Sequence, residues 1–137
     1  MVARKERTLL IQVESLDDEP SPPSSALHNE LREAIRRAGI SNDPMHPRHY
    51  SREARLCSVR IPRASTSDVS TAIKSIRYVG RWPVRLSVVR AFGNERLARR
   101  AFAARCEDVL SGSLADNPEG QRAVRELLEK LVDLQRA

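Results

Sequence analysis

The 137-residue sequence has few cysteines, few aromatic residues and no long hydrophobic run, and each shortage argues against a class of protein. Two cysteines, Cys57 and Cys106, cannot supply a disulfide framework, which favours an intracellular protein with reduced thiols. No apolar segment approaches the roughly 20 residues that span a bilayer. The opening MVARKERTLLIQVE has too short an apolar run for a secretory signal, so we expect neither export nor a membrane partner.

Motifs of nucleotide-binding and hydrolytic enzymes are also missing. The sequence contains no G-x-x-x-x-G-K-S/T, no G-x-G-x-x-G and no G-x-S-x-G. The carboxylates at 17–19 lie among prolines in a segment typical of a solvated turn. His46 and His49, with Cys57 or Asp43 as an imagined third ligand, form a weak candidate for a metal site. We therefore expect the polypeptide to have no catalytic residue, no bound metal and no cofactor of its own.

Positive charge, in contrast, is abundant and concentrated in the middle of the chain. Residues 44–105 contain 14 basic and 3 acidic residues, a net charge of +11, whereas residues 1–43 carry −2 and residues 106–137 carry −3. Only three of the cations are lysines. Arginine favours bidentate contacts with phosphate and stacking on bases, so the middle segment favours a polyanion, most simply RNA. A solvated basic face without a ligand is the alternative.

Apolar periodicity predicts four strands and four helices. The strands are expected at 8–13, around 49–50, at 56–61 and at 84–89. The helices are expected to begin after Ser25, Ser65, Asn94 and Asn117, and the first two to end at Gly39 and Gly80. In 56–61, Cys57, Val59 and Ile61 point to one face and the alternate residues to the other. Ser65 and Asp68 resemble a capping box, and Leu97, Phe102 and Val109 are expected to anchor the third helix.

The order strand, helix, strand, strand, helix, strand is that of a ferredoxin-like antiparallel sheet with helices on one face. We therefore expect an α+β fold, β-α-β-β-α-β with two additional C-terminal helices. Residues 1–137 would form a single RNA-binding domain, with a ferredoxin-like core over about 7–92 and a helical extension over about 94–136. The extension would cover or flank the remaining face of the sheet.

The shortage of aromatic residues bears on how such a domain would bind RNA. A sheet of this topology can stack bases on two or three aromatics of its central strands, but 56–61 and 84–89 contain none. Electrostatic contact by arginines is the remaining mode, with Trp82 either stacking on a base or covering the edge of the core. The predicted RNA-binding residues are Arg60, Arg63, Arg77, Arg81, Trp82, Arg85, Arg90, Arg96, Arg99 and Arg100.

Three stretches together form a pattern that resembles a known family. A predicted strand ends in Arg60-Ile61-Pro62-Arg63, the next begins at Gly80-Arg81-Trp82-Pro83-Val84, and KERTLLIQVE opens the chain with a basic and then apolar run. Over about residues 4–14 and 56–105 this resembles the ribonuclease P protein component 2 family, the archaeal counterpart of a small protein subunit shared by eukaryotic RNase P and RNase MRP. The chain departs from the family at Phe92-Gly93-Asn94, where small hydroxyl residues usually flank the glycine, and in the longer, proline-rich segment 15–25.

The resemblance implies an accessory subunit of ribonuclease P, non-catalytic by itself, in the endoribonuclease that removes the 5′ leader of precursor tRNA. Such a subunit would bind and stabilise the catalytic RNA, on which Mg²⁺ is expected, and would pair with a TIM-barrel-like protein subunit. It would meet precursor tRNA only indirectly. Its location would be cytoplasmic in an archaeal cell, or nuclear or nucleolar in a eukaryotic one. The alternatives are a general structured-RNA-binding or ribosome-associated protein, and a protein-interaction module with solvated arginines.

Overall fold

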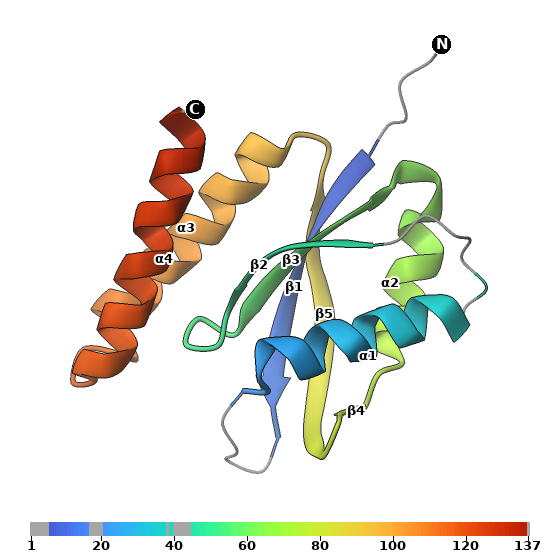
Figure 1. The fold of residues 1–137 in the computed structure, drawn as a ribbon, viewed down its shortest axis with the longest axis horizontal. Coiled ribbons are helices and arrows are strands. Elements are labelled where there is room, and N and C mark those ends of the chain that lie inside the picture. Colours follow the sequence, from blue (N-terminus) through green and yellow to red (C-terminus); the bar gives the residue numbers. More distant parts are fainter. Residues whose placement is uncertain (1–5, 17–20, 38, 40–44, 137) are drawn as a thin grey trace.

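A computed structural model describes residues 6–16, 21–37, 39 and 45–136, with side chains as far as residue 131. These residues form an antiparallel sheet and four α-helices (Figure 1), which confirms the predicted α+β class. The strands are β1 (Glu6–Ser15), β2 (His46–Ser51), β3 (Leu56–Pro62), β4 (Tyr78–Val79) and β5 (Trp82–Phe92). The helices are α1 (Ser24–Arg37), α2 (Thr66–Lys74), α3 (Glu95–Ser111) and α4 (Pro118–Arg136). No helix in these ranges is long and apolar enough to cross a membrane.

The first strand lies at the centre of the sheet. Its order is β2-β3-β1-β5-β4, with β1 antiparallel to β3 on one side and to β5 on the other. Residues Thr8–Ile11 are buried without interruption, because helices cover both faces of β1. The predicted alternation in β3 is confirmed, with Cys57 and Val59 in one hydrophobic cluster and Leu56 in the other.

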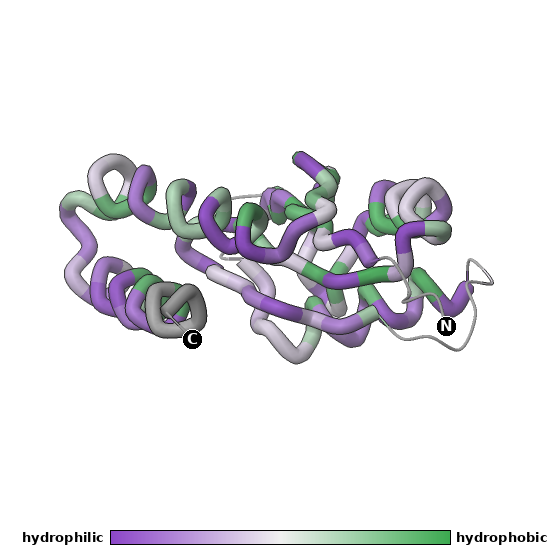
Figure 2. Tube along the Cα trace, turned by 90° about the horizontal axis from the view of Figure 1, so that it is seen from above, coloured by the Kyte–Doolittle hydropathy of each residue, from purple (hydrophilic) through white to green (hydrophobic). Residues whose placement is uncertain are grey.

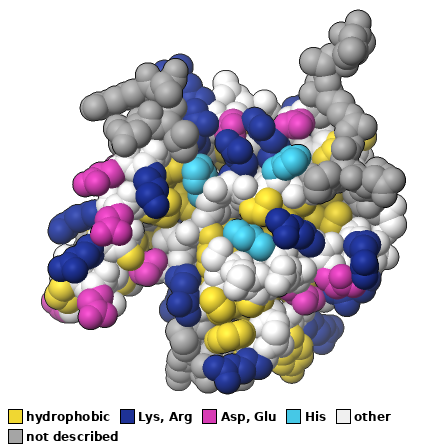
Figure 3. Space-filling view, viewed as in Figure 1, with side chains coloured by type: hydrophobic (Ala, Val, Ile, Leu, Met, Phe, Trp, Pro, Cys, Tyr) yellow, Lys and Arg dark blue, Asp and Glu magenta, His cyan; other side chains and the backbone are white. Residues whose placement is uncertain are grey.

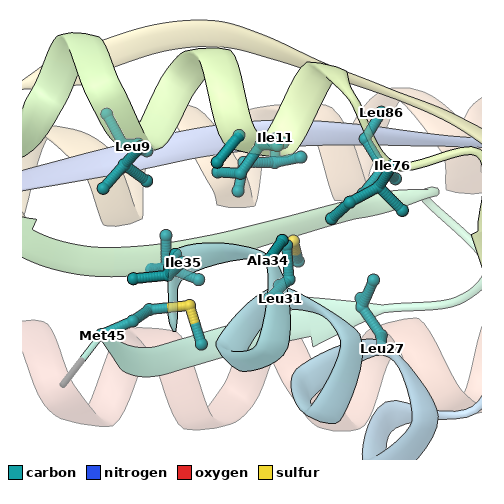
Figure 4. Close-up of a cluster of buried hydrophobic side chains, with 14 of the residues drawn as sticks. Leu9, Ile11, Leu27, Leu31, Ala34, Ile35, Met45, Ile76 and Leu86 are labelled. Atoms are coloured by element: carbon teal, nitrogen blue, oxygen red, sulfur yellow. The ribbon is translucent and has the colours of Figure 1, made fainter. Parts of the chain in front are cut away.

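The helices α1 and α2 cover the first face of the sheet. Leu27 and Leu31 on α1 are fully buried because apolar residues recur on one side of that helix. They meet Leu9 and Ile11 from β1, and Figure 4 shows these side chains pointing toward one another. The predicted edge strand is confirmed as β2, and Tyr50 on it packs against the same cluster.

The helix α3 covers the other face of the sheet, and α4 packs against α3. Their buried side chains form a second hydrophobic cluster with Leu10, Leu56 and Phe92 of the sheet. α3 contacts β1, β3 and β5 and lies beside α4 at one end of the molecule (Figures 1 and 2). The buried residues of α3 are Ala98, Phe102 and Cys106, which repeat every four positions on one side. Leu97, which was expected to anchor this helix, is 49% exposed, so that expectation is wrong. Position 97 lies about 100° around the helix from the buried stripe.

Helix ends follow the predicted caps at α3 and α4 but not at α2. The side chain of Asn94 accepts a hydrogen bond from the backbone N–H of Arg96 at 2.8 Å, and Asn117 accepts one from Gly120 at 3.0 Å. A 3₁₀ turn over Arg63–Ser65 precedes α2, and Ser65 makes no capping hydrogen bond with its side chain. The capping box predicted there is absent from these residues.

The second helix is also shorter than predicted, and a short strand follows it. α2 ends at Lys74, after which β4 pairs with the start of β5. Gly80, between β4 and β5, has φ +59°, which only glycine adopts without strain. Gly80 therefore lies in the turn of a hairpin and does not end the helix. Pairing with β1 extends β5 to Phe92, beyond the predicted 84–89.

We expect the two apolar residues of α3 to respond differently to truncation. Phe102→Ala should lower the free energy of unfolding by about 3–5 kcal/mol, because a fully buried aromatic ring is removed. Leu97→Ala should lower it by less than about 1 kcal/mol, since half of that side chain is in solvent. Urea denaturation of both variants measures the difference, and equal losses would contradict the observed orientation of α3.

Candidate nucleic-acid interface

The predicted RNA-binding residues lie in two groups at opposite ends of β5. One group is at the hairpin of β4 and β5 and contains Arg77, Arg81, Trp82 and Arg85. The other is around the junction of β5 and α3 and contains Arg60, Arg63, Arg90, Arg96, Arg99 and Arg100. A strand rises about 3.3 Å per residue, so the ends of β5 are roughly 30 Å apart. The structure therefore presents two surfaces, here called the hairpin surface and the junction surface.

Charges of both signs are mixed on the face of the molecule seen in Figure 3. Lys and Arg side chains are dispersed there among Asp and Glu side chains. The positive side chains therefore form no single continuous patch on this face. Arginines that are ion-paired with carboxylates differ from free arginines in their availability to an anionic ligand.

At the hairpin surface, Arg81 and Trp82 form one stacked unit. The Arg81 guanidinium lies 4.9 Å from the centroid of the Trp82 ring, a cation–π distance. Trp82 is partly buried and packs against the first hydrophobic cluster. A Cβ placed on Gly80 would lie 3.5 Å from the same ring. Of the two roles considered for Trp82, the structure shows it packed at the edge of the core.

Tyr78 is an exposed aromatic residue that was not among the predicted site residues. It is 61% exposed on β4, between the exposed residues Arg77 and Arg81, and its register partner on β5 is Pro83. An exposed ring among guanidiniums suits stacking on a base. The signal was present in the sequence as Arg77-Tyr78 and Arg81-Trp82, an alternation of cations with aromatics.

Arg85 of the hairpin surface and Arg90 of the junction surface are the members of each group nearest to the other along β5. Arg85 lies opposite Glu14 and Arg90 opposite Leu10, on the face of the sheet that α3 partly covers. The Arg90 guanidinium stacks on the Phe92 ring at 4.8 Å. Phe92 is only 7% exposed, so this aromatic, which the longer β5 adds to the sheet, is no open platform for a base.

At the junction surface, Glu95 collects three arginines into a network that we call the Glu95 hub. Arg60 Nη2 lies 2.9 Å from Glu95 Oε2, while Arg60 Nε lies 2.8 Å from Glu6 Oε2. Arg99 Nη1 is 3.7 Å from the same Glu95 oxygen, and Arg48 Nε contacts the other one. Glu95 is in the first turn of α3, where the helix dipole favours a carboxylate.

The Glu95 hub changes what the predicted arginines can do. It joins β1, β2 and β3 to α3 through side chains that are 16–39% exposed. Two predicted RNA-binding residues, Arg60 and Arg99, are ion-paired there. Arg63, Arg90, Arg96 and Arg100 are exposed, and no ion pair links them to another described residue. Contact of any of these residues with RNA stays a prediction.

His49 lies beside the hub in an environment that disfavours its charged form. Burial, and then the nearby Arg48, lower the pKa of His49 below its usual value. The ring lies 5.8 Å from the ring of Phe102. His46 and His49 pair with Arg60 and Ser58 of β3, whereas Cys57 faces the first hydrophobic cluster.

Those residues considered for metal binding that the structure describes do not converge on one site. Asp43 and the carboxylates at 17–19 lie outside the described residues. Within the described ranges, no group of three or more His, Cys, Asp or Glu side chains is placed to hold a metal ion. Burial raises the pKa of the Cys57 thiol to about 12 and that of Cys106 to about 11, so neither is a thiolate at neutral pH.

Comparison with known proteins gives a likeness at the level of the fold. No family model matches the chain, and no curated protein matches it. A chain in the cryo-EM structure of yeast ribonuclease MRP is similar, with a TM-score of 0.54 at 15% identity. The similarity covers 79% of this chain and 95% of that chain. It shows a shared fold.

We expect Glu95→Gln to lower the free energy of unfolding by about 2 kcal/mol, because three guanidiniums lose the carboxylate that they share. Glu107→Gln on the same helix is the matched control. Glu107 is exposed, and its side chain has no ion-pair partner among the described residues. The control should change stability by less than about 0.5 kcal/mol. Thermal or urea denaturation measures both, and equal effects would show that the hub does not stabilise the fold.

Proposed function

We propose that this chain is an RNA-binding subunit of an RNA-processing ribonucleoprotein related to RNase P and RNase MRP. The observation that carries the proposal is the set of exposed arginines along β5 and at both of its ends that form no ion pair with a described carboxylate. These are Arg63, Arg77, Arg81, Arg85, Arg90, Arg96 and Arg100. A free guanidinium contacts phosphate without first breaking an internal ion pair, so these residues are better suited to RNA than Arg60 or Arg99.

Two other findings support the proposal. The fold is similar to that of a chain in yeast ribonuclease MRP. Independently of that likeness, the sequence pattern at Arg60–Arg63 and Gly80–Val84 resembles a protein family of RNase P. In our proposal the strand order β2-β3-β1-β5 corresponds to a ferredoxin-like sheet, with β4 as an addition.

The finer proposal is an accessory subunit of RNase P that binds and stabilises the catalytic RNA for removal of the 5′ leader of precursor tRNA. Mg²⁺ and the hydrolytic chemistry would belong to the RNA. A TIM-barrel-like protein subunit is the proposed protein partner, and the cytoplasm the proposed location. The exposed arginines would act by neutralising closely spaced phosphates, with release of the counterions that otherwise screen them.

The positions of the exposed arginines along β5 indicate how the chain would contact a folded RNA. The two ends of β5 lie roughly 30 Å apart, with Arg85 and Arg90 on the strand between them. One copy of the chain would contact segments of a folded RNA at both ends of this strand and hold them in place. Such contacts depend on backbone position and shape more than on base sequence.

Reconstitution tests the proposed function. Addition of the chain together with the TIM-barrel-like subunit should raise the rate at which RNase P RNA cleaves precursor tRNA at low Mg²⁺. Equal affinity for unrelated structured RNAs, with no rate enhancement, would point to a general RNA-binding protein. RNA binding that is weak at physiological salt would point to a protein-interaction module.

The hairpin surface makes a prediction about salt dependence. Replacing Arg77, Arg81 and Arg85 by Gln should reduce the slope of log Kd against log salt concentration by about 2 to 3, if each guanidinium contacts one phosphate. The matched control replaces three arginines of α1, Arg32, Arg36 and Arg37, by Gln. Two of these are already ion-paired, Arg36 to Glu33 and Arg37 to Glu30. Both variants lose the same net charge. A slope that falls equally in both would refute a localised phosphate contact at the hairpin surface.

A further inference from the structure

A groove runs along the C-terminal half of α3, away from the Glu95 hub. Its larger part, a cavity of about 730 Å³, lies between α3, the loop that follows α3 and the turn between β2 and β3. Its smaller part, about 330 Å³, lies between α3 and the sheet. Gln12, Arg105 and Asp108 line both parts, so the two adjoin; we call them together the α3 groove. Figure 3 shows a notch between the lobe of α3 and α4 and the rest of the molecule.

Arg55 in this groove has an unfavourable backbone conformation. Its φ is +55°, and it is the only non-glycine residue with positive φ among those described. The left-handed region costs an ordinary residue about 1 kcal/mol, and glycine or asparagine usually occupies such a turn position. The Arg55 carbonyl accepts a hydrogen bond from Val13 N at 2.8 Å, which fixes the strained residue against the end of β1. Arginine has no conformational advantage in this turn, which indicates that its side chain has another role.

Three guanidiniums line the larger part of the groove. Arg52 is held by two hydrogen bonds that it donates to the carbonyl of Ser21, at 2.7 and 3.0 Å. Arg55 and Arg105 are exposed, and neither forms an ion pair within the described part of the chain, although Glu53 and Asp108 line the same cavity. The lining therefore carries three positive and two negative charges. One bound phosphate would fit this balance.

The smaller part of the groove is mostly apolar. Leu10 and Leu56 form its floor, and Ala101 and Ala104 on α3 leave the space open because their side chains are small. Val89, 56% exposed on β5, lies at its side. Gln12 and Asp108 line both parts and supply the polar groups at their boundary; the Gln12 amide also donates a hydrogen bond to Glu14 at 3.3 Å. Its volume is at the lower end of the range for small-ligand sites, about 300–1,000 Å³.

We infer that the α3 groove binds one unpaired nucleotide of an RNA, its base in the apolar part and its phosphate at Arg55 and Arg105. A nucleotide has an apolar ring with a polar edge joined to an anion, and the groove presents matching surfaces in that order. The inference rests on the proposed function and adds to it. The hairpin and junction surfaces contact paired RNA through its backbone, whereas the α3 groove selects a nucleotide that has left the helix.

Two short RNA hairpins of equal length and charge test the inference, one fully paired and one with a single bulged nucleotide. The wild-type chain should bind the bulged hairpin about tenfold more tightly, as burial of one base contributes about 1–3 kcal/mol. Arg55→Gly should remove most of this preference while leaving the melting temperature unchanged or higher, because glycine relieves the strain at φ +55°. Ala104→Leu should remove it by filling the apolar part. Neither variant should change affinity for the paired hairpin by more than about threefold, because Arg55→Gly removes a single charge and Ala104→Leu removes none.

Matched controls separate a loss of charge or an added side chain from a loss of the site. Arg122→Gln on α4 removes one exposed positive charge outside the groove, and Ser111→Leu adds similar bulk at the exposed end of α3. Both should keep the preference for the bulged hairpin. Addition of AMP at millimolar concentration distinguishes a free nucleotide from a nucleotide in RNA, and we expect it to leave the preference intact.

Four outcomes would overturn the inference. Equal affinity of the wild-type chain for the two hairpins would exclude an unpaired-nucleotide site while leaving the proposed function in place. A preference that survives both Arg55→Gly and Ala104→Leu would put the site elsewhere. Abolition of the preference by AMP at concentrations far below the millimolar range would show that the groove prefers a free nucleotide to one in RNA. Failure to bind either hairpin would overturn the proposed function together with this inference.

Discussion

The burial of β1 on both faces is the constraint on which the rest of the structure depends. This strand pairs with β3 and β5, and its residues Thr8–Ile11 are buried between two layers of helices. A strand in that position has no room for unpaired charge, because burying an isolated ion costs several kcal/mol. Most of the described arginines therefore lie toward strand ends, on β2 and β5 beside the central strands, in the turn between β2 and β3, and on the exposed sides of helices.

That constraint divides the arginines into two kinds. Where α3 crosses the sheet, Arg48, Arg60 and Arg99 are close enough to the interior to need a partner, and Glu95 supplies it. Further out, arginines such as Arg77, Arg85 and Arg100 are exposed and need none. The first kind stabilises the arrangement of α3 on the sheet, and the second kind is free for an anionic ligand. Net charge alone does not distinguish them, since both contribute equally to the +11 of residues 44–105.

The sequence predicted the features that depend on neighbouring residues. The alternation in β3, the caps at Asn94 and Asn117 and the left-handed Gly39 after α1 all follow from local periodicity or from one residue's hydrogen bonding. Features that depend on distant residues were missed. Arg60 and Glu95 are 35 positions apart, so their ion pair is a product of the tertiary fold. The same holds for the burial of Ala98 in place of Leu97, because the sheet decides which side of α3 is covered.

The candidate interface was predictable in composition but not in layout. The arginines and the aromatic residues between them are visible in the printed sequence, and packing on the core was one of the two roles considered for Trp82. The structure was needed to show that the arginines gather toward the two ends of β5. It was also needed to show that an arginine with φ +55° lies beside a cavity. The central claim is that the free arginines at the ends of β5 contact RNA. Photo-crosslinking of the chain to RNase P RNA, followed by mass spectrometry of the attached peptides, tests it most directly. Crosslinks should concentrate in peptides that span 77–85 and 90–100, whereas crosslinks confined to α1 and α4 would contradict the claim.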